Sequence, residues 1–162
     1  MRALTPRLML LVLGLLCVSS VGLAFLAQHR FEMQPCPWCI LQRIQFLVLG
    51  ALTLVAAGLP SSLGRRVLSA LTLPVALSGV AAALWQHFVA AKSTSCALTL
   101  ADRVISATGL DTRWPEWFEV RANCSDASAI LMGMPFEFWS LALFAVAAVV
   151  LLINAMTPHR RA

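Results

Sequence analysis

Charged side chains are scarce in this sequence. Only 12% of its 162 residues are Asp, Glu, Lys or Arg, whereas 60% are hydrophobic. A soluble domain of this size could neither bury nor cover so much apolar surface, which excludes an ordinary soluble protein. The net charge of +5 does not indicate a nucleic-acid partner, because no run of Lys and Arg is interleaved with aromatic residues. We therefore expect an integral membrane protein that contacts the lipid bilayer.

Four apolar segments predict four transmembrane helices in a single all-α membrane domain, a four-helix bundle. The segments are residues 8–26, 39–59, 67–88 and 135–156. Each provides roughly the 20 residues needed to cross a hydrocarbon core of about 30 Å. The rest of the chain forms links at 27–38, 60–66 and 89–134 and a tail at 157–162. A cleaved signal peptide is the alternative for the first segment, but that segment is long for one and stays apolar to its end.

The long link 89–134 contains one amphipathic pattern. Leu98, Ala101, Val104 and Ile105 recur at the spacing of one helix face. This pattern predicts a short amphipathic helix, which either lies on the membrane surface or packs against the link itself.

The distribution of charge predicts how the helices are oriented in the membrane. One set of links and ends is basic and contains no acidic residue: Arg2, Arg7, Arg65, Arg66, Arg160 and Arg161. All seven acidic residues lie in the opposite links or at their edges. The positive-inside rule then places both termini and the link 60–66 in the cytoplasm. In a bacterial inner membrane the other two links face the periplasm, which is oxidising.

Residues 35–43 read Pro-Cys-Pro-Trp-Cys-Ile-Leu-Gln-Arg and carry the clearest chemical motif. Pro37 suits the first position of a helix, because its missing N–H would have no partner there. We therefore expect Cys36 to cap a helix and Cys39 to lie in its first turn, where the positive helix end favours a thiolate. Arg43 follows Cys39 by four residues and shares its face. The motif predicts a redox site.

Three further cysteines complete the set. Cys96 and Cys124 lie in the long outer link and form the natural second pair. Cys17 lies inside the first apolar segment, where a single cysteine is usually a small hydrophobic residue.

Three interpretations of the four outer cysteines compete. Two structural disulfides would suit Cys96 and Cys124, which close a long loop, but the ring between Cys36 and Cys39 is too short to restrain much of the unfolded chain. A four-cysteine zinc site is disfavoured by the single C-x-x-C and by the oxidising compartment. A relay remains, in which one pair exchanges with an outside protein and the other passes electrons onward. Such a relay needs one pair on a loop and one fixed pair, as the sequence provides.

A relay also needs a final electron acceptor. The sequence contains no ligand set for haem, flavin or an iron–sulfur cluster, and no metal site is predicted. Because Cys39 lies where the membrane begins, the acceptor should be lipid-soluble, and a membrane quinone takes the two electrons and two protons that a dithiol gives. Arg43 could polarise a quinone carbonyl or extend to lipid headgroups. His87 ends the third segment on the same side and could transfer protons, or be an interfacial histidine.

Together these features resemble the DsbB family of bacterial membrane thiol oxidases. The features are the four membrane segments, the Pro-Cys-x-x-Cys-x-x-x-Arg motif at 35–43, two cysteines in the second outer link, and Met134-Pro135 before the last segment. The resemblance implies an inner-membrane protein-dithiol:quinone oxidoreductase that supports disulfide formation in secreted proteins. It would reoxidise a thioredoxin-like periplasmic oxidase of the DsbA type and reduce ubiquinone or menaquinone.

The resemblance also implies a role for each site residue. Cys96 would form the mixed disulfide with the partner, and Cys124 would resolve it and exchange with Cys36. Cys39 and Arg43 would lie beside the quinone, and His87 roughly matches a histidine near it.

Two other functions remain as alternatives. Vitamin K epoxide reductase-like enzymes also couple thiols to quinones, but they usually carry the quinone-side C-x-x-C on a later helix. A non-enzymatic membrane scaffold with two structural disulfides is the second alternative.

Overall fold

The computed structural model describes residues 5–92, 99–125, 130–131 and 133–156. Four long helices dominate it, and all four are long and apolar enough to cross a membrane. They are α1 (Pro6–Arg30), α2 (Pro37–Gly58), α3 (Ser62–Phe88) and α7 (Phe136–Met156). The shorter elements are η1 (Ala90–Lys92), α4 (Leu100–Thr108), α5 (Leu110–Arg113), α6 (Pro115–Phe118), β1 (Ile130–Leu131) and β2 (Met134–Pro135).

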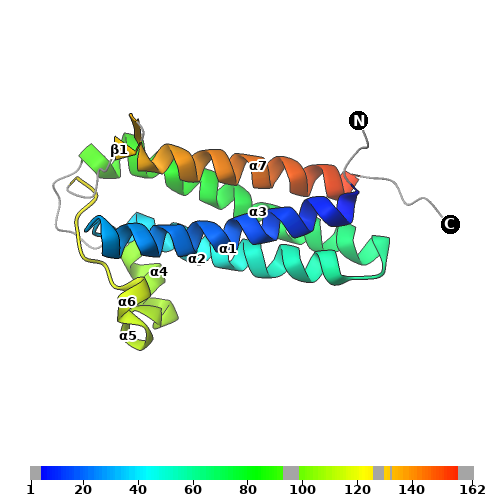
Figure 1. The fold of residues 1–162 in the computed structure, drawn as a ribbon, viewed down its shortest axis with the longest axis horizontal. Coiled ribbons are helices and arrows are strands. Elements are labelled where there is room, and N and C mark those ends of the chain that lie inside the picture. The colour runs from blue at the N-terminus through cyan, green and yellow to red at the C-terminus, as the bar shows by residue number, and fades with distance from the viewer. Residues whose placement is uncertain (1–4, 93–98, 126–129, 132, 157–162) are drawn as a thin grey trace.

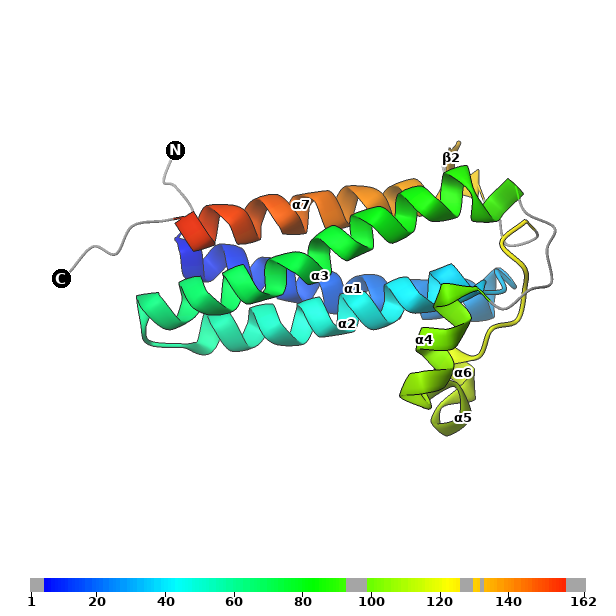
Figure 2. The same cartoon turned by 180° about the vertical axis from the view of Figure 1, so that it is seen from behind.

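The four long helices pack into an elongated bundle (Figure 1). Each helix packs on the next in the chain, and α1 also contacts α7, which closes the bundle. The start of α1, the turn between α2 and α3, and the end of α7 lie at one end of the bundle. The link from α1 to α2 and the elements α4, α5 and α6 lie at the other end, as the view from behind also shows (Figure 2). We call this second end the cysteine end, because Cys36, Cys39 and Cys124 lie there.

Small residues allow close contact between helices in the bundle. A Cβ atom added to Gly14 of α1 would meet the side chains of Thr53 and Leu54 on α2, and one added to Gly50 of α2 would meet Val18. Cys17 is buried in the hydrophobic core of the bundle, where it clusters with Leu13 and Leu49. This position agrees with its interpretation as a small hydrophobic residue. Close packing of this kind is the main source of helix association in lipid, where the hydrophobic effect between helices is absent.

Arginine side chains bind helix-end carbonyls at the end opposite the cysteines. Arg7 Nε donates to the carbonyl of Ala57 at 2.7 Å, and Arg66 Nε donates to that of Ala155 at 3.1 Å. These carbonyls belong to the last turns of α2 and α7, where a helix has no partners of its own for its final C=O groups. The basic residues that predict the membrane orientation therefore also complete two helix ends.

The helix α4 begins with a capping box. Thr99 Oγ1 accepts from the backbone N–H of Asp102 at 3.3 Å, and the Asp102 carboxylate accepts from the N–H of Thr99 at 2.7 Å. The helix ends at Gly109, whose φ of +63° is the left-handed conformation that favours glycine. Both ends of this short helix are thus fixed locally.

The amphipathic face of α4 packs against the bundle. Ala101 contacts the cluster that contains Cys36, and Ile105 packs with Ile40. Val104, predicted on the same face, is instead partly exposed, because it lies to one side of the line joining Ala101 to Ile105. Leu98 falls outside the described residues. The predicted four-helix membrane bundle with a short amphipathic helix is confirmed, and the contacts of that helix are mainly with α2.

A substitution at Gly79 tests the packing of α3 on α7. A Cβ atom there would collide with the ring of Phe144, which is fully buried and stacks on Phe46 with ring centroids 4.0 Å apart. Gly79→Ala should therefore destabilise the protein by about 1–3 kcal/mol, in spite of alanine's better helix propensity. Thermal unfolding in detergent micelles, followed by circular dichroism, measures the loss.

Gly22→Ala is the matched control, since a Cβ atom at Gly22 meets nothing within 4 Å. This variant should be as stable as the unmodified chain or slightly more so. Equal melting temperatures for the two variants would contradict the close contact between Gly79 and Phe144.

Candidate functional site

The paired cysteines occupy the beginning of α2. Cys36 is the N-cap residue and its Sγ accepts from the backbone N–H of Cys39 at 3.3 Å, while Pro37 is the first helical residue. This arrangement confirms the predicted cap. The two Sγ atoms lie 2.8 Å apart, within reach of a disulfide. The open N–H groups of this first turn favour negative charge on either sulfur.

One face of α2 carries the polar residues of the site. Cys39 lies at its centre, with Gln42 and Arg43 on either side, three and four residues further along. Gln42 Nε2 donates to Gln86 Oε1 of α3 at 2.7 Å, and Gln86 Nε2 lies 3.4 Å from the Cys39 sulfur. The Cys39 sulfur thus contacts the buried amide of Gln86, which is itself hydrogen bonded to Gln42.

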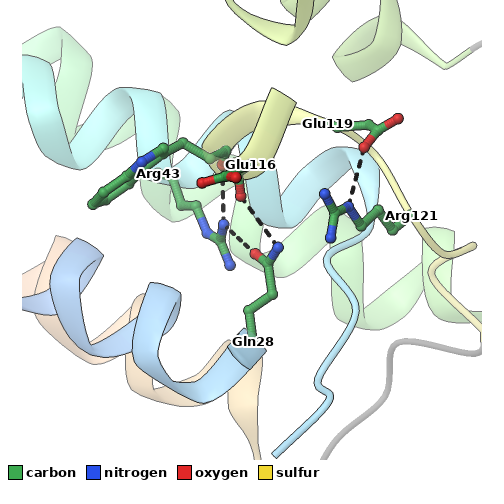
Figure 3. Close-up of polar contacts among 6 residues, drawn as sticks. Gln28, Arg43, Glu116, Glu119 and Arg121 are labelled. Carbon is green, nitrogen blue, oxygen red and sulfur yellow. Dashed lines mark hydrogen bonds and ion pairs between the residues drawn. The ribbon is translucent and has the colours of Figure 1, made fainter. Parts of the chain in front are cut away.

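Arg43 points the other way, toward α1. Its Nη1 atom donates to Gln28 Oε1 at 2.8 Å and to the carbonyl of Trp117 at 3.0 Å, and its Nη2 atom donates to the carbonyl of Ala24 at 3.4 Å. The side chain is 6% exposed. Figure 3 shows Gln28 meeting both Arg43 and the backbone of Glu116. Arg43 is therefore held inside the protein and does not extend to the headgroups in this structure.

A third sulfur joins the cysteine pair. Cys124 packs with Cys39 against the cluster around Cys36 and Trp38, so the three cysteines lie in one group. The backbone before Cys124 is tied to the same place, because the N–H groups of Arg121 and Ala122 both donate to the carbonyl of Pro35. The chain thus brings a cysteine of the second link to the first.

Interactions among the three cysteines shift the pKa values of Cys36 and Cys124 in opposite directions. Donation by the Cys36 thiol lowers the pKa of Cys124, although burial opposes the effect, and a hydrogen bond from the backbone of Trp38 adds to it. The same donation to Cys124 and Cys39, together with burial, raises the pKa of Cys36. In the reduced protein the Cys36 thiol therefore acts as a hydrogen-bond donor, and Cys124 ionises more readily than Cys36.

His87 lies at the same end of the bundle with a different set of contacts. Its Nδ1 lies 2.9 Å from the carboxylate of Glu137, which is almost fully buried. Its ring also packs against Phe88 and Phe138. These contacts join α3 to α7, whereas Arg43 faces α1.

Cys96 lies outside the described residues, so the structure does not test its predicted role.

Several buried polar residues near the cysteines were not predicted from the sequence. Sequence reasoning missed four buried polar residues that surround the site: Gln28, Gln42, Gln86 and Glu137. A glutamine or glutamate at the end of an apolar segment is ambiguous in sequence, because many such residues only contact water or headgroups. The described residues contain no cluster of ligands that could hold a metal ion.

Comparison with known proteins identifies the family. The family model described as "Disulfide bond formation protein DsbB" matches residues 6–154. The chain is 29% identical to Disulfide bond formation protein B 1 of Pseudomonas putida, over 96% of this chain and 94% of the relative. It is 32% identical to the protein of that name in Pseudomonas syringae pv. syringae, over 86% and 83%. It is 28% identical to Disulfide bond formation protein B of Nitrosomonas europaea, over 85% and 86%. The chain belongs to the DsbB family of membrane proteins, oxidoreductases that act in disulfide bond formation.

Proposed function

We propose that this protein reoxidises a thioredoxin-like periplasmic oxidase of the DsbA type and transfers the electrons to ubiquinone or menaquinone. It would act in the bacterial inner membrane, with both termini in the cytoplasm and the cysteine end in the periplasm. One observation carries the proposal: the sulfur atoms of Cys36, Cys39 and Cys124 meet at one end of the bundle, one helical turn from a buried arginine.

The sulfur route consists of successive thiol–disulfide exchanges, in which each disulfide that forms is balanced by one that breaks. A thiolate of the partner attacks Cys96 of a Cys96–Cys124 disulfide, which forms a mixed disulfide and releases the Cys124 thiolate; the partner's second thiol then closes the partner's disulfide and releases Cys96. The Cys124 thiolate attacks Sγ of Cys36, the bond between Cys36 and Cys39 breaks, and Cys39 leaves as a thiolate. The Cys96 thiolate then attacks Sγ of Cys124, which restores the Cys96–Cys124 disulfide, releases Cys36 and leaves Cys36 and Cys39 as the pair that carries the two electrons. The packing of Cys124 against the cluster around Cys36 supports its role as the attacking group.

The direction of flow requires a strong acceptor. A partner of this type has a potential of about −120 mV, so electrons leave it only for a couple of comparable or higher potential. A quinone bound beside Cys39 would supply a lipid-soluble acceptor of two electrons and two protons.

The residues near Cys39 fit such a ligand. A quinone offers carbonyl oxygens, which need hydrogen-bond donors. Arg43 has five N–H donors, and three bonds from it are accounted for among the described residues. The indole N–H of Trp38 is buried and has no partner in the described part of the chain. Arg43 and Trp38 therefore have N–H groups without hydrogen-bond acceptors in the described part of the chain, and these groups could bind the carbonyl oxygens of a quinone.

Arg43 would have two effects at this site. Its positive charge stabilises the Cys39 thiolate one helical turn away, and its remaining N–H groups would bind a carbonyl oxygen on which negative charge develops. Burial strengthens both effects, because water does not screen the charge.

One assay tests the proposal as a whole. Purified protein, reduced partner and a water-soluble quinone are mixed, and the absorbance of the quinone is followed. Loss of oxidised quinone that depends on both the partner's thiols and the four outer cysteines is expected. If no thiol-dependent loss occurs, the protein is better explained as a scaffold with two structural disulfides.

The first prediction concerns the resolving cysteine. The partner is supplied with its second cysteine replaced by alanine and its first cysteine activated as a mixed disulfide with a small thiol, which Cys96 displaces. In Cys124→Ala no neighbouring thiol can then resolve the new bond, so Cys96 should retain the partner as a covalent adduct. A non-reducing gel reveals the adduct by its combined mass. The double variant Cys96→Ala/Cys124→Ala is the control and should give none. An adduct in that control, or none in Cys124→Ala, would reverse the assignment.

The second prediction concerns Arg43. Arg43→Ala should raise the apparent KM for quinone by roughly tenfold or more, because a charge-assisted hydrogen bond contributes about 1.5–3 kcal/mol. The KM for the partner should change less. Steady-state kinetics with each substrate varied in turn separate the two effects. Quinone kinetics equal to those of the unmodified protein would show that the guanidinium only holds the protein together.

The third prediction uses the acidity of Cys124. Its lowered pKa means that the thiolate persists to lower pH, so alkylation of Cys124 in the reduced protein should reach half its maximal rate below the value near 8.5 of a free cysteine. In Cys36→Ala the donated hydrogen bond is lost, and the midpoint should rise. Rates of iodoacetamide modification against pH, measured by mass spectrometry, give both midpoints. Identical midpoints would exclude the hydrogen bond as the cause.

A further inference from the structure

The amide of Gln28 connects three parts of the protein at the cysteine end. Its Oε1 accepts from Arg43 Nη1 at 2.8 Å, and its Nε2 donates to the carbonyl of Glu116 at 3.2 Å. The side chain is 4% exposed. The donor on one side and the acceptor on the other fix which way the amide points. A neutral side chain of α1 thus bridges a cation of α2 and the backbone of α6 (Figure 3).

The same part of α6 has two more contacts with the bundle. The Trp117 carbonyl accepts from Arg43 Nη1 at 3.0 Å. The Trp117 ring stacks on Phe25 of α1, with centroids 3.9 Å apart and an angle of 10° between planes. Phe25 and Gln28 are three residues apart and therefore share a face of α1. Contacts of three kinds hold residues 116 and 117 against α1 and α2.

These contacts lie on the stretch of chain that leads to Cys124, residues 114–124. Phe118 is buried against Ile40 and Ile105. Further along, the N–H groups of Arg121 and Ala122 donate to the Pro35 carbonyl at 3.0 and 3.3 Å. Cys124 follows two residues later. The position of Cys124 beside Cys36 is therefore set by two anchors, one at Pro35 and one at Gln28 and Arg43.

We propose that Gln28 is a positioning residue for the exchange between the two cysteine pairs. It holds the 114–124 segment so that the Cys124 sulfur meets Cys36. This inference rests on the proposed function, in which a Cys36–Cys124 bond forms as the Cys36–Cys39 bond breaks and Cys39 leaves as a thiolate. Gln28 contacts none of the reacting sulfur atoms in the described structure and acts through the segment it binds.

Arg43 connects the segment that carries Cys124 with the proposed quinone site. Arg43 binds the segment that delivers Cys124, and it is also the residue proposed to bind the quinone. Any change in the guanidinium position that accompanies quinone binding would alter its bonds to Gln28 and Trp117, and by reciprocity the docking of the segment would alter the affinity for quinone.

The test measures the exchange inside the protein, without partner or quinone turnover. The full chain carrying Cys96→Ala is prepared with a Cys36–Cys39 disulfide and a free Cys124 thiol, and is equilibrated at pH 8. After acid quenching, free thiols are blocked, the protein is digested, and the fraction carrying a Cys36–Cys124 disulfide is measured by mass spectrometry. Adding Gln28→Leu should lower the ratio of Cys36–Cys124 to Cys36–Cys39 disulfide by about three- to tenfold, as expected for loss of the one hydrogen bond from Gln28 to the 114–124 segment.

Two further variants make the result specific. Phe25→Leu removes the ring under Trp117 without changing the bonds of Gln28, and it should lower the same ratio. Gln45→Leu is the matched control: Gln45 is another glutamine at a helix contact, and its Nε2 donates to Ser78 of α3 at 3.1 Å, away from the 114–124 segment. This control should leave the ratio unchanged.

The outcomes separate the inference from the proposal on which it rests. If the Cys96→Ala protein forms the Cys36–Cys124 disulfide, and neither Gln28→Leu nor Phe25→Leu lowers its fraction, the positioning role is wrong and the relay stands. The same conclusion follows if Gln45→Leu lowers the fraction as much as Gln28→Leu does. If the Cys96→Ala protein forms none of this disulfide, the exchange in the proposed function is wrong, and the role of Gln28 falls with it.

Discussion

The buried positive charge of Arg43 is the constraint on which the cysteine end depends. A guanidinium removed from water needs hydrogen-bond acceptors on its N–H groups, and leaving them unmet would cost several kcal/mol. Here α1 supplies Gln28 and the Ala24 carbonyl, while α6 supplies the Trp117 carbonyl. Three segments that are distant in sequence must therefore meet around one side chain. Their meeting places the link that carries Cys124 against the helix that carries Cys36.

The site combines a cysteine pair fixed in a helix with a third cysteine that a loop brings to it. Cys36 and Cys39 are fixed because they belong to the first turn of α2, whose start is set by Pro37 and by the sulfur cap. Cys124 is delivered by backbone hydrogen bonds to Pro35 and by the packing of α6. This division suits thiol–disulfide exchange, because one sulfur must approach and leave while the other keeps its environment.

Local signals in the sequence predicted the long helices and the cap at Cys36, because hydropathy and proline geometry act over a few residues. The partners of Gln28, Gln86 and Glu137 could not be predicted, since each forms its contact with a residue on a different element. Arg43 shows the same limit: its place on the Cys39 face follows from spacing, whereas its direction toward α1 depends on Gln28. Cys96 lies outside the described residues, so its predicted partnership with Cys124 remains a prediction.

The arginines at the opposite end of the bundle have a consequence for the evolution and engineering of membrane topology. Arg7 and Arg66 belong to the basic residues that predict the orientation of the chain, and they also bind the terminal carbonyls of α2 and α7. Neutralising them to invert the protein would simultaneously leave those carbonyls without donors. The sidedness predicted for this bundle and the integrity of its helix ends therefore depend on the same two residues, so a change at either position affects both.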